Sequence, residues 1–417
     1  MEERQVAITG LGAVSPVGNT VEDAWRNLLA GCSGIRTIPE FVEAQMRCQF
    51  GGPVRDLDMG KYLEPKEQSR LDPFCCYAMA AGMQALAQSG IDPDSADFNP
   101  HRAGVLVSSG IGGLETSTQQ AARLFERGAR AVSPLTIPMM IADMASGYLA
   151  IHTHFQGPNF GIVSACASGL HSIGEAAWII RRGDADLMLA GGAENGITPL
   201  GHAAFASMRA FSTRNDDPQH ASRPFDLTRD GFVPASGAGV LMLEELEHAR
   251  KRGARILALL SGYGATGDAH HITAPREDGE CAAEAIRIAL AHAGLSPESI
   301  GYVNAHGTST HLNDLVETRV LKRALGDHAR RTPVSSTKSM TGHMLGAAGG
   351  FESVVCVQAL LHGIVPGTMN LNTPDPECDL DYIPNQAREL PGLQHVLKLN
   401  MGFGGHNAAV VFSRYQG

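Results

Sequence analysis

Apolar, strand-like runs alternate with helical stretches along the chain, and glycine often joins one to the next. The apolar runs predict buried strands at Val6–Ile8, Gly104–Ser108, Gly161–Ser164, Asp186–Ala190 and Gly239–Leu243. The helical patterns predict helices at Ala78–Ser89, Ala167–Arg182, Ala282–Ala293, Leu315–Leu325 and Glu352–Leu361. Two more strands, His395–Asn400 and Ala408–Phe412, flank a glycine-rich turn. This alternation predicts an α/β fold whose sheets are covered on both faces.

The length of the chain predicts more than one core unit. A domain usually holds roughly 100–200 residues, and this chain has 417. The charged run Glu244–Arg255 is typical of a solvated helix followed by a connector. We place a boundary near residue 253, which gives two unequal α/β halves, residues 1–253 and 254–417.

Composition and charge argue against several classes of protein. Hydrophobic residues at 43% and charged residues at 18% are typical of a folded, water-soluble chain. A net charge of −10 without a basic run argues against nucleic-acid binding. No apolar run reaches the roughly 18 residues of a membrane helix, and the charged start of the chain is unlike a signal peptide. We therefore expect a cytoplasmic protein without a membrane partner.

The segment Ser164–Gly169 is the strongest local candidate for chemistry. An expected strand ends there, and a helix begins at Cys166. A thiol at a helix N-terminus lies at the positive end of the dipole, which favours the thiolate. The small neighbours Ala165, Ala167 and Ser168 leave room for a bulky acyl group. A buried structural cysteine is the alternative, and it is the more frequent fate of cysteines.

Two further segments place basic side chains at the ends of expected strands. Asn304–Thr310 carries His306 directly after the strand at 300–303. Ser335–His343 carries Lys338 and His343, five residues apart, among small and hydroxylic neighbours. Site residues gather at strand ends in open α/β sheets. A turn histidine and a surface lysine are the alternative interpretations.

The glycine-rich turn Gly402–Asn407 completes the set of candidates. Glycine on both sides of Phe403 lets the backbone bend and present an N–H group inward. A simple hairpin turn is the alternative. Other patterns fail: Gly10-Leu11-Gly12 begins like a dinucleotide-binding fingerprint but lacks its third glycine. The pair His152 and His154, expected on one face of a strand, offers too few ligands for a metal site.

Together these segments resemble the β-ketoacyl-[acyl-carrier-protein] synthase family, and in particular its elongating type II members. The resemblance runs over nearly the whole chain, and the combination of a central cysteine, HGTST, KSMTGH and GFGG is highly specific. It implies the thiolase fold, in which two similar α/β halves form five layers, αβαβα. It also implies a homodimer and an acyltransferase of fatty-acid synthesis.

The resemblance implies a role for each matching residue. Cys166 would be the nucleophile that takes an acyl group from acyl-carrier protein, and Phe403 would supply an oxyanion N–H and a gate. His306 and His343 would stabilise the enolate left when malonyl-carrier protein loses CO2. The enolate would then attack the acyl-cysteine and give a 3-oxoacyl product. This chemistry would need no cofactor, since the phosphopantetheine arrives on the carrier protein.

The remaining matches would support the substrate and the carrier protein. Lys338 would lie close to Glu317 and hold the histidines, with Asp314 beside it. Thr308 and Thr310 would bind the pantetheine arm. Ile111 and Phe205 would line the acyl pocket. An acidic carrier needs a basic docking patch on this acidic chain. The matching positions are Lys66, Arg70, Arg130 and Arg209.

The chain departs from the family near its last turn. Asn400-Met401 stands where relatives carry Ser-Phe, and His311–Asn313 replaces a proline-containing turn. Lys398 and Leu399 lie where relatives place ligands of a structural monovalent cation. We hypothesise that the Lys398 ammonium substitutes for that ion. A Lys398 side chain in solvent would rule this out.

Three alternatives stay open. The first is a ketosynthase of a type II polyketide, polyene or other specialised lipid pathway, with or without a partner subunit. The second is a non-enzymatic subunit similar to a chain-length factor, which the presence of Cys166, His306 and His343 opposes. The third, a thiolase or a CoA-primed synthase, is disfavoured because those relatives carry one histidine with an asparagine or cysteine.

Overall fold

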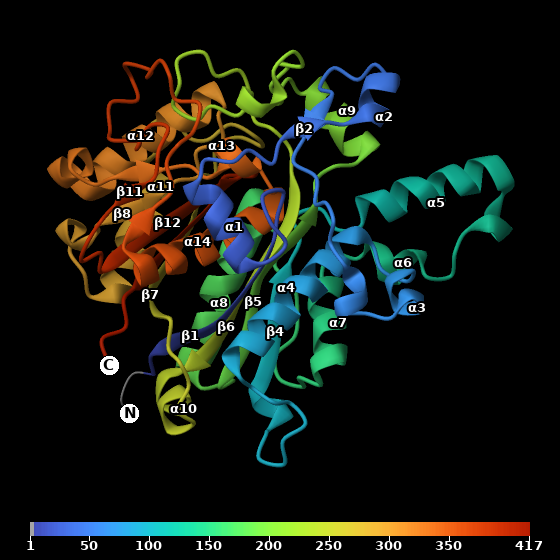
Figure 1. The fold of residues 1–417 in the computed structure, drawn as a ribbon, viewed down its shortest axis with the longest axis horizontal. Coiled ribbons are helices and arrows are strands. Elements are labelled where there is room, and N and C mark those ends of the chain that lie inside the picture. Colours follow the sequence, from blue (N-terminus) through green and yellow to red (C-terminus); the bar gives the residue numbers. More distant parts are fainter. Residues whose placement is uncertain (1–3) are drawn as a thin grey trace.

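The computed structural model describes residues 4–417 and has a mixed, nine-stranded sheet at its centre (Figure 1). The strand order is β4-β5-β6-β1-β7-β13-β12-β8-β9. The strands are β1 (Val6–Val14), β4 (Ala103–Ser108), β5 (Leu187–Asn195), β6 (Ser236–Glu245), β7 (Ala258–Gly267), β8 (Tyr302–Asn304), β9 (Val334–Ser335), β12 (His395–Gly402) and β13 (His406–Ser413). Two small ribbons pair β2 (Arg36–Thr37) with β3 (Phe50–Gly51) and β10 (Ile364–Val365) with β11 (Arg388–Glu389).

The sheet consists of two similar halves joined by a short seam. Strands β4, β5, β6 and β1 come from the first part of the chain, and the other strands come from the second. The seam is the antiparallel pairing of Val6–Ile8 with residues 258–260. The two halves predicted from the resemblance are therefore present, and hydrogen bonds connect them into one sheet. The division near residue 253 stays a prediction, and residues 1–3 lie outside the described part.

Helices cover the sheet in layers, as expected for this α/β arrangement (Figure 1). Helices α8 (Ser168–Arg182) and α14 (Ala348–His362) pack on each other and on strands of both halves, so they form the central layer. The outer layers contain α4 (Pro73–Ser89), α7 (Met144–Thr153), α11 (Glu280–Ala293) and α12 (His311–Leu325). The remaining helices are α1 (Val21–Leu29), α2 (Pro39–Glu43), α3 (Pro65–Gln68), α5 (Leu114–Arg127), α6 (Thr136–Met140), α9 (Pro199–Ser207), α10 (Leu246–Lys251) and α13 (Lys338–Thr341).

The two central helices begin with equivalent turns, which shows that the two halves repeat the same local structure. A 3₁₀ turn, Ala165–Ala167, precedes α8, and an equivalent turn, Leu345–Ala347, precedes α14. Ala165 and Leu345 both have positive φ, 51° and 46°. Each helix spans 15 residues and ends at a left-handed glycine. The first turn delivers Cys166 to the interior, while the second delivers Gly346.

One apolar segment is long enough to meet the criterion for a membrane span, contrary to the expectation from the sequence. Residues 345–362, which include α14, have a mean hydropathy of 1.2. However, 89% of this segment is buried inside the fold. The segment is therefore the central core helix, and its apolar character reflects burial between helix α8 and strands of both halves.

A second departure concerns Gly161–Ser164, which does not form the predicted strand. The chain here runs along the edge of the sheet beyond β4, and an isolated bridge joins Asn159 to Val105. Side chains satisfy its backbone instead: Ile162 donates to the Ser108 hydroxyl, and the Ser146 hydroxyl donates to the Phe160 carbonyl. The apolar pattern correctly placed this segment at the sheet. Hydrogen bonds to side-chain hydroxyls, however, replace the strand-to-strand hydrogen bonds of a β-ladder. His152 was also misplaced, because it lies in helix α7 rather than on a strand.

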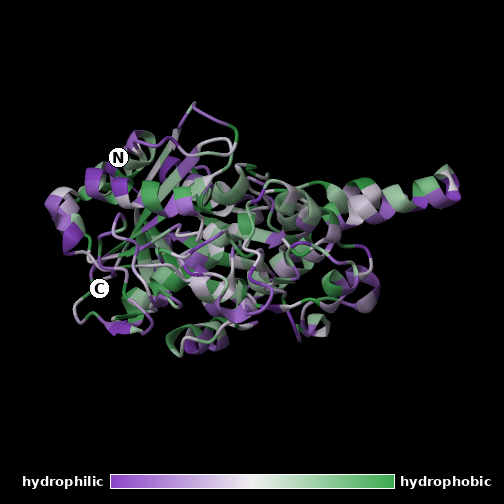
Figure 2. Cartoon of the chain, turned by 90° about the horizontal axis from the view of Figure 1, so that it is seen from above, coloured by the Kyte–Doolittle hydropathy of each residue, from purple (hydrophilic) through white to green (hydrophobic). Residues whose placement is uncertain are grey.

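An arm made of α5 and α6 extends from the body and carries apolar side chains (Figures 1 and 2). Phe125 is 86% exposed and Ile137 is 59% exposed. Exposed apolar residues also occur at the sheet edge, where Val163 is 60% exposed. Large apolar surfaces of this kind are typical of interfaces.

Glycine allows the outer helices to lie directly on the sheet. A Cβ on Gly10 or Gly12 of β1 would fall 2.0 or 1.8 Å from a carbonyl oxygen of α4. A Cβ on Gly262 or Gly264 of β7 would fall 2.0 Å from a carbonyl oxygen of α11. The Gly10-Leu11-Gly12 pattern therefore serves helix–sheet packing in this fold, and the second half uses the same device.

We predict that Gly12→Ala is strongly destabilising, because a backbone carbonyl cannot move aside as a flexible side chain can. The expected loss in the free energy of unfolding is about 1–3 kcal/mol or more. Gly267→Ala is the matched control, since its Cβ would meet no atom closer than 4.0 Å. Urea denaturation of both variants measures the difference. Equal stability of the two variants would contradict the packing argument.

Candidate active site

The candidate residues from distant parts of the chain meet around one cavity of about 550 Å³. The cavity is of the size that small-molecule sites usually have. Its wall includes these predicted residues: Cys166, His306, His343, Phe403, Thr308, Thr310, Ile111 and Phe205. Lys338, Asp314 and Glu317 are fully buried and do not line the cavity. The first half supplies the cysteine, and the second half supplies the histidines.

Cys166 lies in the tight turn that leads into α8, and the glycine-rich turn packs against it. A Cβ on Gly402 would fall 2.6 Å from the carbonyl oxygen of Ser164, so only glycine fits at this approach. The backbone N–H groups of Phe403 and Cys166 both point to the sulfur. Two N–H groups at one point are the arrangement of an oxyanion hole.

Burial controls the protonation of this thiol. It raises the pKa of Cys166 to about 12, against the opposing effects of the Lys338 ammonium and of the two N–H groups. The backbone N–H groups at the helix start favour the thiolate, as expected, but the effect of burial on the pKa of Cys166 is larger. The proton must leave as the sulfur attacks, and the N–H groups stabilise the charge at that moment.

His306 and His343 face each other across the cavity wall, with ring centroids 5.3 Å apart and planes at 87°. Burial lowers the pKa of both imidazoles well below the usual value, and the ammonium groups of Lys338 and Lys398 lower it further. Both rings are therefore neutral, and each can donate one N–H. Phe232 packs edge-to-face against His343, with the two ring centroids 5.3 Å apart.

Glu317 positions the first histidine through the backbone. Its carboxylate accepts hydrogen bonds from the N–H groups of His306 and Gly307, at 2.6 and 2.7 Å. Burial raises the pKa of Glu317 to about 7, and these two donors act against that shift. Asp314, one turn earlier in α12, also accepts hydrogen bonds from backbone N–H groups, those of Phe225 and Ser309.

Lys338 forms an ion pair with Glu352 of α14. Glu317 is close enough to raise the pKa of Lys338 by its charge, as Glu352 does. Glu352 also pairs with Lys398, whose Nζ lies 2.7 Å from Oε2. All three side chains are fully buried. The Lys398 ammonium donates to the carbonyl oxygens of Asn304, Ala305 and Leu399, at 2.9–3.3 Å. The requirement that Lys398 be away from solvent is thus met.

Two residues of this region were not among the sequence candidates. Asn400 contacts the ring of His306 through its amide. Glu194 of β5 accepts hydrogen bonds from Ser109, Gly110 and Gly346, and thereby ties the Ile111 loop to the start of α14. Burial raises the pKa of Glu194 to about 7. Each could have been found in the sequence as a polar or acidic residue within an otherwise apolar strand.

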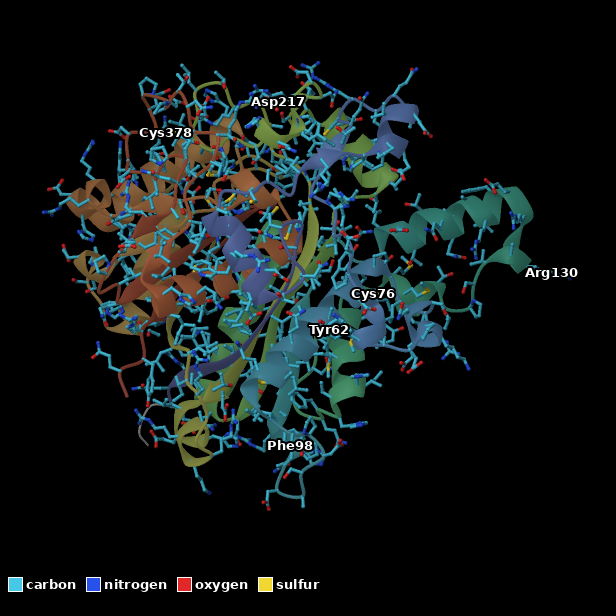
Figure 3. The ribbon with its side chains drawn as sticks, in the orientation of Figure 1. Tyr62, Cys76, Phe98, Arg130, Asp217 and Cys378 are labelled. Carbon is cyan, nitrogen blue, oxygen red and sulfur yellow. The ribbon has the colours of Figure 1, made fainter. Side chains whose placement is uncertain are left out.

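The docking candidates are exposed but do not form one patch on this chain. Arg209 lines the mouth of the cavity. Lys66 and Arg70 lie in and just after α3, away from the cavity wall. Arg130 lies at the far end of the arm (Figure 3). Among residues 4–417, no three His, Cys, Asp or Glu side chains are grouped to hold a metal ion.

The chain matches two family models over most of its length. Residues 3–249 match the beta-ketoacyl synthase N-terminal domain, and residues 257–372 match the C-terminal domain. The chain belongs to the beta-ketoacyl synthase family. This assignment confirms the resemblance, and it makes the protein a ketosynthase, an acyltransferase-type enzyme.

Relatives of this ketosynthase match it from end to end. The 3-oxoacyl-[acyl-carrier-protein] synthase 2 of Synechocystis sp. is 50% identical over 100% of this chain and 99% of the relative. The synthase of the same name from Vibrio cholerae is 48% identical over 99% of this chain and all of the relative. The beta-ketoacyl synthase structure from Burkholderia phymatum has a TM-score of 0.92 at 33% identity, over 99% of this chain and all of that one.

A further solved structure contains a type II polyketide ketosynthase in complex with its acyl-carrier protein, bound to a hexaketide. It superposes with a TM-score of 0.91 at 33% identity and covers both chains completely. The thiolase fold is therefore shown. The higher identities belong to synthases named for 3-oxoacyl products, so the polyketide alternative is not favoured.

We predict that His306 and His343 stay neutral from about pH 8 down to about pH 6, where exposed imidazoles gain a proton. The reason is that their pKa values are lowered, so protonation requires a more acidic solution. NMR of histidine-labelled protein measures this, with His306→Asn and His343→Asn to assign the two rings. An exposed histidine such as His271 serves as the internal control. Protonation of either buried ring near pH 6.5 would contradict the prediction.

Proposed function

We propose that this ketosynthase elongates acyl groups carried on acyl-carrier protein by decarboxylative condensation with malonyl-carrier protein, in fatty-acid synthesis. The observation that carries the proposal is the convergence of Cys166, two neutral histidines and two N–H donors on one cavity. A thiol supplies covalent catalysis, and fixed donors stabilise the negative oxygen.

In the first half-reaction, the Cys166 sulfur attacks the thioester carbonyl of the acyl-carrier protein. The carbonyl oxygen becomes negative and is stabilised by the N–H groups of Cys166 and Phe403. The carrier thiolate then leaves, takes the proton that the cysteine loses, and the acyl group stays on the sulfur. Removing one such donor costs roughly 3–4 kcal/mol of transition-state stabilisation.

In the second half-reaction, the malonyl thioester loses CO2, and the electron pair of the broken bond forms an enolate. The N–H groups of His306 and His343 stabilise the enolate oxygen. The enolate carbon attacks the acyl-cysteine carbonyl, a carbon–carbon bond forms and the carbon–sulfur bond breaks. The cysteine thiolate leaves and regains a proton, and the carrier departs with a 3-oxoacyl group.

Side chains at the cavity mouth are suited to the pantetheine arm. The hydroxyls of Thr308 and Thr310 lie 3.0 Å apart and line the cavity. Arg209 offers a positive charge at the entrance to an acidic carrier. The rings of Phe403 and Phe205 line the cavity with their centroids 6.4 Å apart. In the proposed reaction, Phe403 is the gate that swings when Cys166 is acylated.

We infer that two copies of the chain associate through the sheet edge and the arm. The edge at 158–163 has few ladder partners, and the apolar side chains of the arm are exposed. Contact with a second copy would pair the backbone of this edge and cover the apolar side chains of the arm. Such a dimer also brings an arm with Arg130 to the partner's carrier site. Sedimentation of the enzyme at the chain mass of 44.1 kDa would contradict the dimer.

Lys398 takes the place of a structural monovalent cation. Its ammonium lies among three carbonyl oxygens and the Glu352 carboxylate, so these groups already hold a positive charge. The proposed condensation uses the thiol, the histidines and the backbone N–H groups and involves no metal or organic cofactor. We propose that the enzyme works in the cytoplasm.

We predict that activity is the same in potassium, sodium and tetramethylammonium buffers of equal ionic strength. The fixed ammonium cannot be removed by dialysis, so the cage does not depend on a dissolved ion. Initial rates in the three buffers measure this, and a rate that requires potassium would overturn the assignment of Lys398.

The function is tested with wild type and Cys166→Ala, a panel of acyl-carrier proteins, malonyl-carrier protein and intact-mass measurement. We expect an acyl adduct and 3-oxoacyl product with wild type only. Cys166→Ala should retain malonyl decarboxylation, because the histidines remain in place. If no fatty acyl donor gives an adduct, the elongation proposal fails and a specialised carrier becomes the substrate. The preferred acyl chain length identifies the pathway.

A further inference from the structure

Asn400 of β12 is a fully buried amide that lies between a carboxylate and a catalytic histidine. Its Nδ2 is 3.0 Å from Nδ1 of His306 and 3.5 Å from Oε2 of Glu352. The amide therefore connects the buried charge cluster to the ring that faces the cavity. No role was assigned to this residue from the sequence.

The charge of Glu352 fixes the direction of this amide. Glu352 forms ion pairs with the ammonium groups of Lys338 and Lys398, and a carboxylate in an ion pair only accepts hydrogen bonds. The NH2 group of Asn400 must then face Glu352, since its carbonyl oxygen would be repelled. The second hydrogen of the same NH2 group points to Nδ1 of His306. Within residues 4–417, Oδ1 of Asn400 has no hydrogen-bond partner.

A donor at Nδ1 determines which nitrogen of His306 carries the proton. The ring is neutral and has one N–H, so an Nδ1 that accepts leaves the proton on Nε2. His343 lacks an equivalent partner, because its Nδ1 is buried without a hydrogen bond among the described residues. A side chain thus selects the tautomer of His306, whereas none selects that of His343.

We propose that Asn400 is a positioning residue that holds His306 as the Nε2–H tautomer, so that this ring donates to the thioester oxygen of the malonyl substrate. The order of effects runs from Lys338 and Lys398 through Glu352 to Asn400 and then to His306. The expected effect on the reaction rate rests on the proposed function, whereas the tautomer of His306 does not depend on it.

Loss of this control affects only one of the two half-reactions. An Nδ1–H tautomer presents a lone pair to the enolate oxygen and repels it. Removing a single oxyanion donor lowers the rate by about 10²–10³-fold in other enzymes. Acyl transfer to Cys166 uses the N–H groups of Cys166 and Phe403 and should not change.

The direct test is NMR of protein labelled with ¹⁵N-histidine, which distinguishes the two neutral tautomers without any substrate. Wild type should show His306 as Nε2–H. In Asn400→Asp, the added group only accepts toward the ring and the signal should change to Nδ1–H. In Asn400→Leu, the preference should disappear. An Nδ1–H or doubly protonated His306 in wild type would overturn the proposal, even if neither variant folds.

Asn195→Leu is the matched control, because Asn195 is a buried amide of β5 that donates to Glu115 and lies outside the cavity wall. It removes a similar hydrogen bond and should leave the His306 signal unchanged. A change in the His306 tautomer in this variant would show that general loosening, rather than the Asn400 contact, controls the ring.

The kinetic test separates the half-reactions of Asn400→Leu. We expect kcat for malonyl decarboxylation to fall about 100-fold with KM nearly unchanged, while the rate of Cys166 acylation stays within about threefold of wild type. Asn400→Ser, which restores a hydroxyl donor, should recover part of the loss. Equal losses in both half-reactions would contradict the positioning role. Absence of both half-reactions in wild type would instead contradict the proposed function.

Discussion

A single buried carboxylate, Glu352, joins the segments that carry the active site. It pairs with Lys338 at the start of α13 and with Lys398 of β12, while Lys398 also donates to the carbonyl groups of Asn304 and Ala305 at the end of β8. Buried ion pairs add little net stability, because desolvation offsets their attraction, but breaking one costs about 3–5 kcal/mol. The cluster therefore specifies where His306, His343 and Asn400 lie rather than simply strengthening the fold.

The same cluster sets the electrostatics of the cavity. The ammonium groups of Lys338 and Lys398 lower the pKa values of both imidazoles, which helps to keep the rings neutral. The same positive charges favour an enolate, whose negative charge develops only during the reaction. Lys338 also lowers the pKa of Cys166, but burial has the larger effect there.

The sequence was sufficient for the catalytic groups because each occupies a recognisable end of a strand or start of a helix. Cys166, His306, His343 and Phe403 could be proposed from local pattern and resemblance, and the cavity brings them together. The ion pair of Lys338 with Glu352 was not predicted, since it depends on how α14 packs against the turn that carries Lys338. Asn400 was known only as a departure, because its role depends on two side chains distant in sequence. The segment 161–164 is not a strand, and the backbone N–H groups of Ile162 and Ser164 donate to the hydroxyls of Ser108 and Ser168 instead.

The paired turns before α8 and α14 have a consequence for how this enzyme can diversify. A Cβ on Gly169 would fall 2.7 Å from the carbonyl of Gly346, and a Cβ on Gly346 would fall 2.3 Å from the nitrogen of Gly110. The two halves thus meet through bare backbone close to Cys166. A side chain at either glycine would collide with the backbone of its neighbour, so packing excludes substitutions in this plane. New substrate ranges must arise at the walls of the cavity, where Ile111 and Met401 can change size while the plane stays constant.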